Sequence, residues 1–112
     1  MALDLHDLLI FFGSEPKIDE SDVPWDYSGA QITFESGDDL VWCRLAPGEG
    51  ELALVWCQGG VKRVELSLEG YFDVKIENTG GEERLVALPQ TSDRRPLVLR
   101  LRPQVFIAIG AV

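Results

Sequence analysis

The chain has 112 residues, 46% of them hydrophobic, which suits a single domain with one core and no need of a disulfide or metal for stability. Its formal net charge of −9 argues against direct binding to nucleic acid or to an anionic membrane surface, because both would repel it. Two cysteines, Cys43 and Cys57, are too few for a disulfide-rich secreted scaffold, so reduced thiols are expected.

Residues 1–13 are predicted to form a short N-terminal amphipathic helix. Leu5, Leu8, Leu9 and Phe12 recur at helical spacing, and Gly13 is suited to end the helix. The apolar stretch follows acidic residues rather than a basic segment, which is atypical of a secretory signal peptide. A cytoplasmic protein is therefore expected, and no apolar run reaches the roughly 18 residues of a membrane span.

Residues 14–28 are predicted to form an acidic loop, because they contain two prolines and five acids without any sustained period. Two aromatic residues stand among these acids, and aromatic anchors amid like charge are typical of a surface that binds a basic protein. In the alternative, the two rings tuck under the edge of the sheet and only pin the loop. The predicted partner-binding residues are Asp19, Glu20, Asp22, Trp25, Asp26 and Tyr27.

From residue 29 onward the pattern changes to short β-rich runs separated by glycine-containing turns, which make up a predicted β-domain over 29–112. Their regular spacing indicates an antiparallel meander. The expected fold is mainly β, a sandwich or partly closed barrel of seven or eight strands with one short N-terminal helix. The predicted strands span 31–36, 39–46, 52–58, 61–68, 72–77, 84–89, 97–102 and 105–109.

The register of the second and third of these strands follows from the turn assigned between them. A three-residue turn at 48–50 would place Trp42 opposite Trp56 and Cys43 opposite Val55. The two cysteines would then share a face as diagonal neighbours, roughly 7–8 Å apart, which disfavours a disulfide.

This register, continued through a two-residue turn at 59–60, predicts two faces. On one face, Trp42 and Trp56 lie beside Arg63, which could stack on Trp56. The helix or the last two strands could cover this face, or it could serve as a second surface for a partner or for a homodimer. The opposite face is predicted to be a continuous core surface made by Val41, Cys43, Leu45, Ala53, Val55, Val64, Leu66, Leu68, Phe72, Val74 and Ile76.

No catalytic residue, metal ligand or cofactor is predicted. His6 is the one histidine, and the chain has no nucleophile elbow, phosphate-binding loop or zinc-ligand spacing. The clustered acids of 19–26 lack the spacing of a calcium-binding loop, so a solvated acidic loop is the simpler interpretation.

Charge is distributed unevenly along the chain. Residues 1–51 carry a net charge of −10, residues 52–83 carry −3 and residues 84–112 carry +4. Either the acidic front and the basic back lie together and compensate, or the acidic front forms one face that a cationic partner could recognise.

The run from Asp22 to Tyr27, the following strand, Gly37-Asp38-Asp39 and the hairpins around Gly59-Gly60 together resemble a group of short bacterial β-rich proteins of the immunity-protein type. Some small acidic proteins of that kind bind and neutralise a toxin encoded beside them. The resemblance implies a protein partner and a non-catalytic role, but it assigns no functional residue.

Three functions are consistent with these observations. The first is a non-catalytic acidic domain that binds a protein, for example an immunity-type protein that neutralises a basic partner by occlusion. The second is a structural or self-associating β-domain, and the third is a small-ligand-binding or hydrolytic β-domain.

Overall fold

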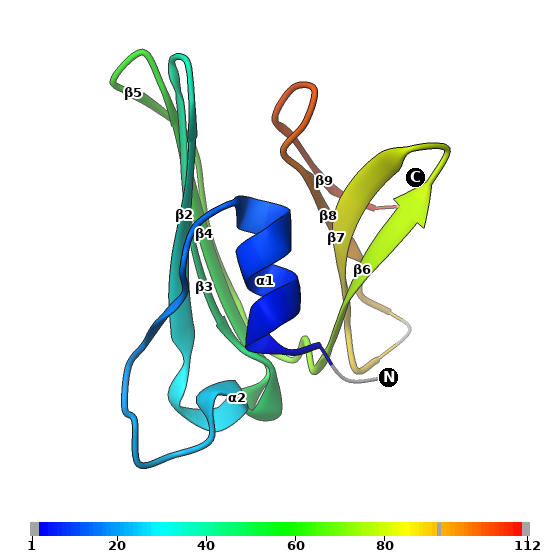
Figure 1. Cartoon of the computed structure of the whole chain (residues 1–112). Helices are drawn as coiled ribbons and strands as arrows, with labels where there is room; N and C mark the ends of the chain where they lie inside the picture. The colour runs from blue at the N-terminus through cyan, green and yellow to red at the C-terminus, as the bar shows by residue number, and fades with distance from the viewer. Residues whose placement is uncertain (1–2, 92, 111–112) are drawn as a thin grey trace.

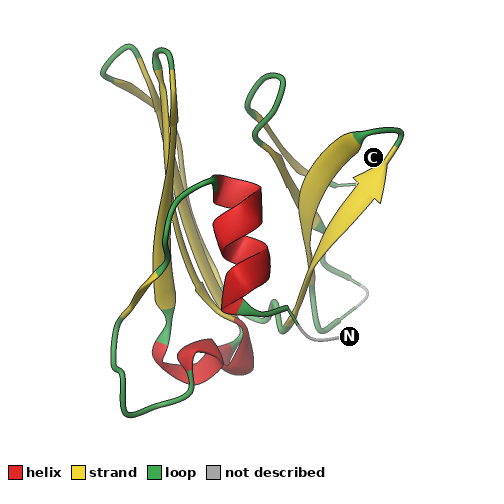
Figure 2. Ribbon diagram, in the orientation of Figure 1, coloured by secondary structure: helices red, strands yellow, loops and turns green. Residues whose placement is uncertain are grey.

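The computed structural model describes residues 3–91 and 93–110, in which two antiparallel sheets face each other around one helix (Figures 1 and 2). Strands β1 to β5 form one sheet and β6 to β9 the other, each in sequence order. The elements are α1 Leu5–Phe12, β1 Lys17–Ile18, α2 Trp25–Ser28, β2 Ala30–Ser36, β3 Asp39–Ala46, η1 Pro47–Glu49, β4 Glu51–Gln58, β5 Val61–Leu68, β6 Asp73–Thr79, β7 Glu82–Leu88, β8 Leu97–Arg100 and β9 Phe106–Ile109.

The mainly β meander is confirmed, and it forms two open sheets rather than a barrel. All eight predicted strands are present, with ends that differ by at most two residues, and the two-residue β1 is added to them. In the part of the chain that the structure describes, no helix is both long and apolar enough to span a bilayer.

Helix α1 lies between the two sheets (blue in Figure 1) and confirms the predicted N-terminal helix over Leu5–Phe12. Residues 1–2 of the predicted span 1–13 lie outside the described residues. Asp4 and Asp7 form a capping box at its start, and Gly13 ends it in the left-handed conformation with φ of 75°. The helix buries Leu8, Phe11 and Phe12, which join core residues from both sheets. Its apolar face therefore links the two layers into one core.

Arg102 adds a polar link between the helix and both sheets. Its Nη1 donates to the Phe11 carbonyl oxygen over 2.8 Å, at the C-terminal end of α1. The same guanidinium lies 5.1 Å from the centre of the Phe34 ring on β2. A residue that follows β8 thus holds the helix end and the first sheet together.

The predicted register of β3 and β4 is wrong by one residue. The connection runs over Pro47–Gly50 and includes the 3₁₀ turn η1, so Trp42 opposes Val55 and Val41 opposes Trp56. Because successive side chains point to opposite faces, this one-residue difference reverses all of β4. Leu52, Leu54 and Trp56 therefore face inward, not Ala53 and Val55.

The pairing of β4 with β5 is correct near the Gly59-Gly60 turn and shifts at a bulge between Trp56 and Cys57. The bulge restores the inward orientation of Val64, Leu66 and Leu68 opposite the reversed β4. The five-stranded sheet consequently has an inner face toward α1 and an outer face, which carries Thr33, Leu40, Trp42, Arg44, Ala53, Val55, Glu65 and Ser67.

Phe72 was expected in the core and instead precedes β6, with 45% of its surface exposed. Tyr71 is the buried residue at this point, and its hydroxyl donates to the Arg95 carbonyl oxygen over 2.7 Å. Val74 and Ile76 do pack in the core as predicted.

Replacing Phe11 with alanine should lower the free energy of unfolding by about 3–5 kcal/mol, because its ring is 1% exposed between the sheets. Ile10, which is 56% exposed on the same helix, provides the control, and Ile10→Ala should cost less than about 1 kcal/mol. Urea titration of both variants measures the difference. Equal losses would contradict the position of α1.

The corrected register places the two free cysteines on opposite faces, Cys43 inside and Cys57 outside. Burial raises the pKa of the Cys43 thiol to about 12, so it should be nearly inert at neutral pH. A disulfide reagent should modify one thiol in the native protein and both in urea, and Cys57→Ser should abolish the native reaction. Native labelling of Cys43 at a comparable rate would contradict this register.

Candidate functional site

The segment 14–28 is more regular than predicted. Lys17 and Ile18 form β1, which pairs with Gln31 and Ala30 of β2, and residues 25–28 form the single turn α2 after Pro24. The segment is therefore attached to the edge of the five-stranded sheet on one side and ends in a helical turn against η1 on the other.

A hydrogen-bonded network on the outer face fixes this segment to the sheet. Arg44 donates through Nε to Asp19 Oδ2 over 2.9 Å, through Nη1 to Glu51 Oε1 over 3.2 Å, and through Nη2 to the Ser28 carbonyl oxygen over 3.0 Å. Gln31 Nε2 donates to Asp19 Oδ1 over 2.8 Å and its Oε1 accepts from Trp42 Nε1 over 3.3 Å. One arginine of β3 thus connects the residue after β1, the end of α2 and the start of β4.

Gly29 makes this arrangement possible. Its φ of 105° is rarely adopted by other residues, and a Cβ at this position would lie 2.5 Å from Arg44 Nη2. A side chain here would displace the guanidinium from the Ser28 carbonyl oxygen.

The network also sets the charge state of Asp19. The hydrogen bond from Gln31, followed by the hydrogen bond from Arg44, lowers the pKa of this carboxyl group. Conversely, the hydrogen bond to Asp19 is the main cause of a raised pKa at Arg44. Asp19 is therefore already paired within the chain, which separates it from the other predicted partner-binding acids.

Glu20, Asp22 and Asp26 are the loop acids that point to solvent or lie partly exposed. Among the described residues, no ion pair and no side-chain hydrogen bond involves any of the three. Their charges are accordingly available to a partner.

The two loop aromatics have different environments. Trp25 is half-buried and packs against the core, so it pins the loop. Tyr27 is 53% exposed, and its ring lies so close to Gly48 that a Cβ there would be 2.9 Å from Tyr27 Cδ1 and Cε1. Trp25 thus takes the anchoring position that was the predicted alternative, whereas the Tyr27 ring stays accessible to solvent.

Phe72 lies against the same turn, and the sequence analysis did not identify it as a surface residue. A Cβ at Gly50 would lie 2.9 Å from Phe72 Cε2 and Cζ. Exposed rings therefore flank η1 at both of its glycines, with Glu49 exposed between them. The signal that could have revealed this is the Gly-Glu-Gly sequence, since two glycines in one turn permit close approach from both sides.

Trp42, Trp56 and Arg63 do not form one surface. Trp56 faces inward, packs against the core and donates through Nε1 to Asp39 Oδ1 over 3.0 Å. Trp42 lies on the outer face with Leu40 and Val55, opposite the face that joins the core. The predicted surface of Trp42, Trp56 and Arg63 depended on the incorrect register, and the two tryptophans lie on opposite faces of the sheet.

The acidic and basic parts of the chain are separated in space. Residues 1–70, which include the first sheet, hold fourteen acids and four bases, whereas residues 71–112 hold five acids and six bases. Each ion pair found among residues 3–91 and 93–110 lies within one of these two parts. No ion pair among the described residues therefore joins the acids of the first part to the bases of the second.

His6 is exposed on α1. Within the described ranges, no three His, Cys, Asp or Glu side chains are grouped closely enough to hold a metal ion. At this end of the five-stranded sheet the structure places the exposed rings of Tyr27 and Phe72 against one turn, next to the segment that carries the exposed acids.

Comparison with known proteins gives a match in structure but none in sequence. No protein-family model and no curated protein matches the chain. A chain of the contact-dependent growth inhibition toxin and immunity protein complex from Klebsiella pneumoniae 342 superposes with a TM-score of 0.82 and 21% identity. The match covers 98% of this chain and 95% of that one, so the likeness extends over the whole fold.

The resemblance stated from the sequence is therefore confirmed at the level of the fold, because the matched chain comes from a complex of a bacterial toxin with its immunity protein.

Asp19→Asn should destabilise the protein by roughly 0.5–1 kcal/mol at neutral pH, because it weakens a partly exposed ion pair. The folded-state pKa of Asp19 is lowered, so its contribution is present above the unfolded value of about 3.9 and is lost as pH falls through the folded value. The stabilities of wild type and variant should therefore converge as the pH falls below the folded-state pKa of Asp19. A difference that persists at that pH would show that the carboxylate charge is not the cause.

Proposed function

We propose that this chain is an immunity-type protein, which binds a basic toxin domain and neutralises it by occlusion without catalysing a reaction. The observation that carries the proposal is the whole-length structural match to a chain of a toxin–immunity protein complex, combined with an acidic surface that is not neutralised within the chain. A protein that acts in this way would work in the cytoplasm, and reduced cysteines suit that compartment.

The acidic side supports recognition of a cationic partner. Charges that lie on one side of a protein steer an oppositely charged partner and raise the association rate, whereas charges that are paired internally do not. Glu20, Asp22 and Asp26 would supply this attraction, while Asp19 would act through Arg44 to hold their loop in place.

Exposed aromatic rings would supply the contact area. Aromatic side chains are frequent among the residues that dominate binding energy, provided that a partner can cover them. Tyr27 and Phe72 meet this requirement because each is about half exposed and each is held against a glycine of the same turn. Trp25 has a supporting role beneath the loop.

Self-association is the second candidate, and the outer face of the first sheet favours it. Leu40 is 41% exposed beside the half-buried Trp42 and Val55. A dimer through this face would change molecular mass with concentration and would depend on Trp42, whereas toxin binding through the loop would not.

The test is rescue from toxicity. The protein captured by this chain from its native lysate would be expressed in a heterologous host, with and without the chain. We expect growth arrest by the partner alone and recovery on co-expression. Replacing Tyr27 by alanine together with Glu20→Gln and Asp22→Asn should weaken binding by at least about tenfold at low salt.

A matched control removes two acids from the basic part of the chain, Glu83→Gln with Asp93→Asn. This variant should retain rescue and affinity, because Glu83 lies in β7 of the second sheet and Asp93 lies between β7 and β8. Absence of toxicity in the captured protein, or equal loss in both variants, would refute the proposal.

A further inference from the structure

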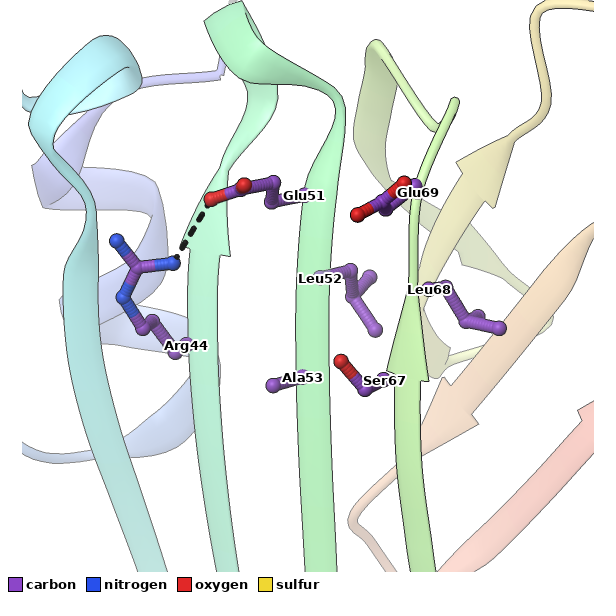
Figure 3. Close-up of a pocket in the computed structure, with 7 residues that line it drawn as sticks. All are labelled: Arg44, Glu51, Leu52, Ala53, Ser67, Leu68 and Glu69. Carbon is purple, nitrogen blue, oxygen red and sulfur yellow. Dashed lines mark hydrogen bonds and ion pairs between the residues drawn. The ribbon is translucent and has the colours of Figure 1, made fainter.

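A cavity of about 250 Å³ opens on the outer face where β4 begins and β5 ends (Figure 3). Arg44 and Glu51 stand on one side and Glu69 on the other, with Ala53 and Ser67 between them. The cavity exists because the register places two small side chains, Ala53 and Ser67, opposite each other. Larger residues at the two positions would fill the space.

The cavity is much larger than the space that one water molecule occupies. A water molecule needs roughly 10–15 Å³ of such volume, so the cavity can accept a side-chain head group together with part of its stem. Its polar lining consists of carboxylates and a hydroxyl group beside one arginine.

The charge of the site favours a cation. Arg44 already donates to Asp19 and Glu51, so its positive charge is offset by two carboxylates. Glu69 makes no ion pair among the described residues, and its side chain is exposed at the rim. The charge of Arg44 is thus offset by its own two partners, and the carboxylate of Glu69 stands across the cavity without a paired cation among the described residues.

Arg94 is a second cation beside the cavity, and it is bonded to the main chain of Glu69 rather than to its carboxylate. Its Nη1 donates to the backbone carbonyl oxygen of Glu69. It lines an adjoining cavity of about 400 Å³ that shares Ser67, Leu68 and Glu69 with the first. The two cavities together form a trough that runs from Glu51 past Glu69 to Arg94. It offers room for the residues that flank an inserted side chain.

We infer that the trough between Glu51 and Glu69 receives an arginine side chain of the partner. This inference rests on the proposed function and adds the chemical group that is recognised. A guanidinium is planar and carries five donors, so it can bridge carboxylates on both walls while Ser67 accepts a further hydrogen bond. An ammonium group would make fewer of these contacts.

The experiment uses the intact, ¹⁵N-labelled protein and the peptide acetyl-Gly-Arg-Gly-amide. Saturable amide shifts should appear at residues 51–53 and 67–69. The citrulline peptide, which has the same shape without the charge, should bind at least about tenfold more weakly, because charge-assisted hydrogen bonds would be lost. A lysine peptide should also bind more weakly, and equal binding would refute a site for guanidinium.

Two variants test whether the peptide binds in the trough or is only attracted by acidic residues in general. Glu69→Gln and Ala53→Leu should each abolish saturation, whereas Glu83→Gln removes the same charge from the second sheet and should leave it intact. Spectra that are otherwise unchanged will show that the variants fold. Shifts spread over residues 19–26, or unaltered by either substitution, would overturn the inference.

The outcome is independent of toxin neutralisation. Failure of the peptide to bind, together with successful rescue from toxicity, would reject the trough alone. Binding of the peptide in a protein that gives no rescue would reject the proposed function and retain a guanidinium site.

Discussion

The turn Pro47–Glu49 sets the geometry on which the other features depend. It determines that Val41 opposes Trp56, and thereby which side chains of β4 meet α1 in the core and which lie outside. The same turn accepts the Tyr27 ring at Gly48 and the Phe72 ring at Gly50. Core packing and the exposed aromatic surface are thus consequences of one short connection.

The outer face combines rigidity with accessibility. Arg44 ties the acidic segment to the sheet through Asp19, and Gly29 leaves the space that its guanidinium needs. A loop held by several hydrogen bonds loses less conformational freedom on binding than a loose one, so more of the contact energy would appear as affinity. The unpaired acids beside it remain hydrated and accessible to a partner.

Much of the fold could be predicted because it depends on local signals. The alternation within strands and the glycine turns located eight strands, and the apolar spacing with Gly13 located α1. The register could not be predicted, since including Pro47 in the connection changes its length by one residue and reverses β4. The bond between Arg44 and Asp19 joins residues 25 positions apart, and such pairings leave no local pattern. Local signals thus placed the strands and the acidic loop, while the three-dimensional contacts decided which of its residues stay accessible.

The separation of charge between the two parts of the chain has a consequence for how encounters begin. A molecule with acids on one side and a slight excess of bases on the other carries a permanent electric dipole. In the field of a cationic protein it experiences a torque over distances near the Debye length, about 8 Å at physiological ionic strength. The torque would orient the protein before contact, with the rings at η1 toward the partner. A larger fraction of collisions would then have the orientation that binding requires.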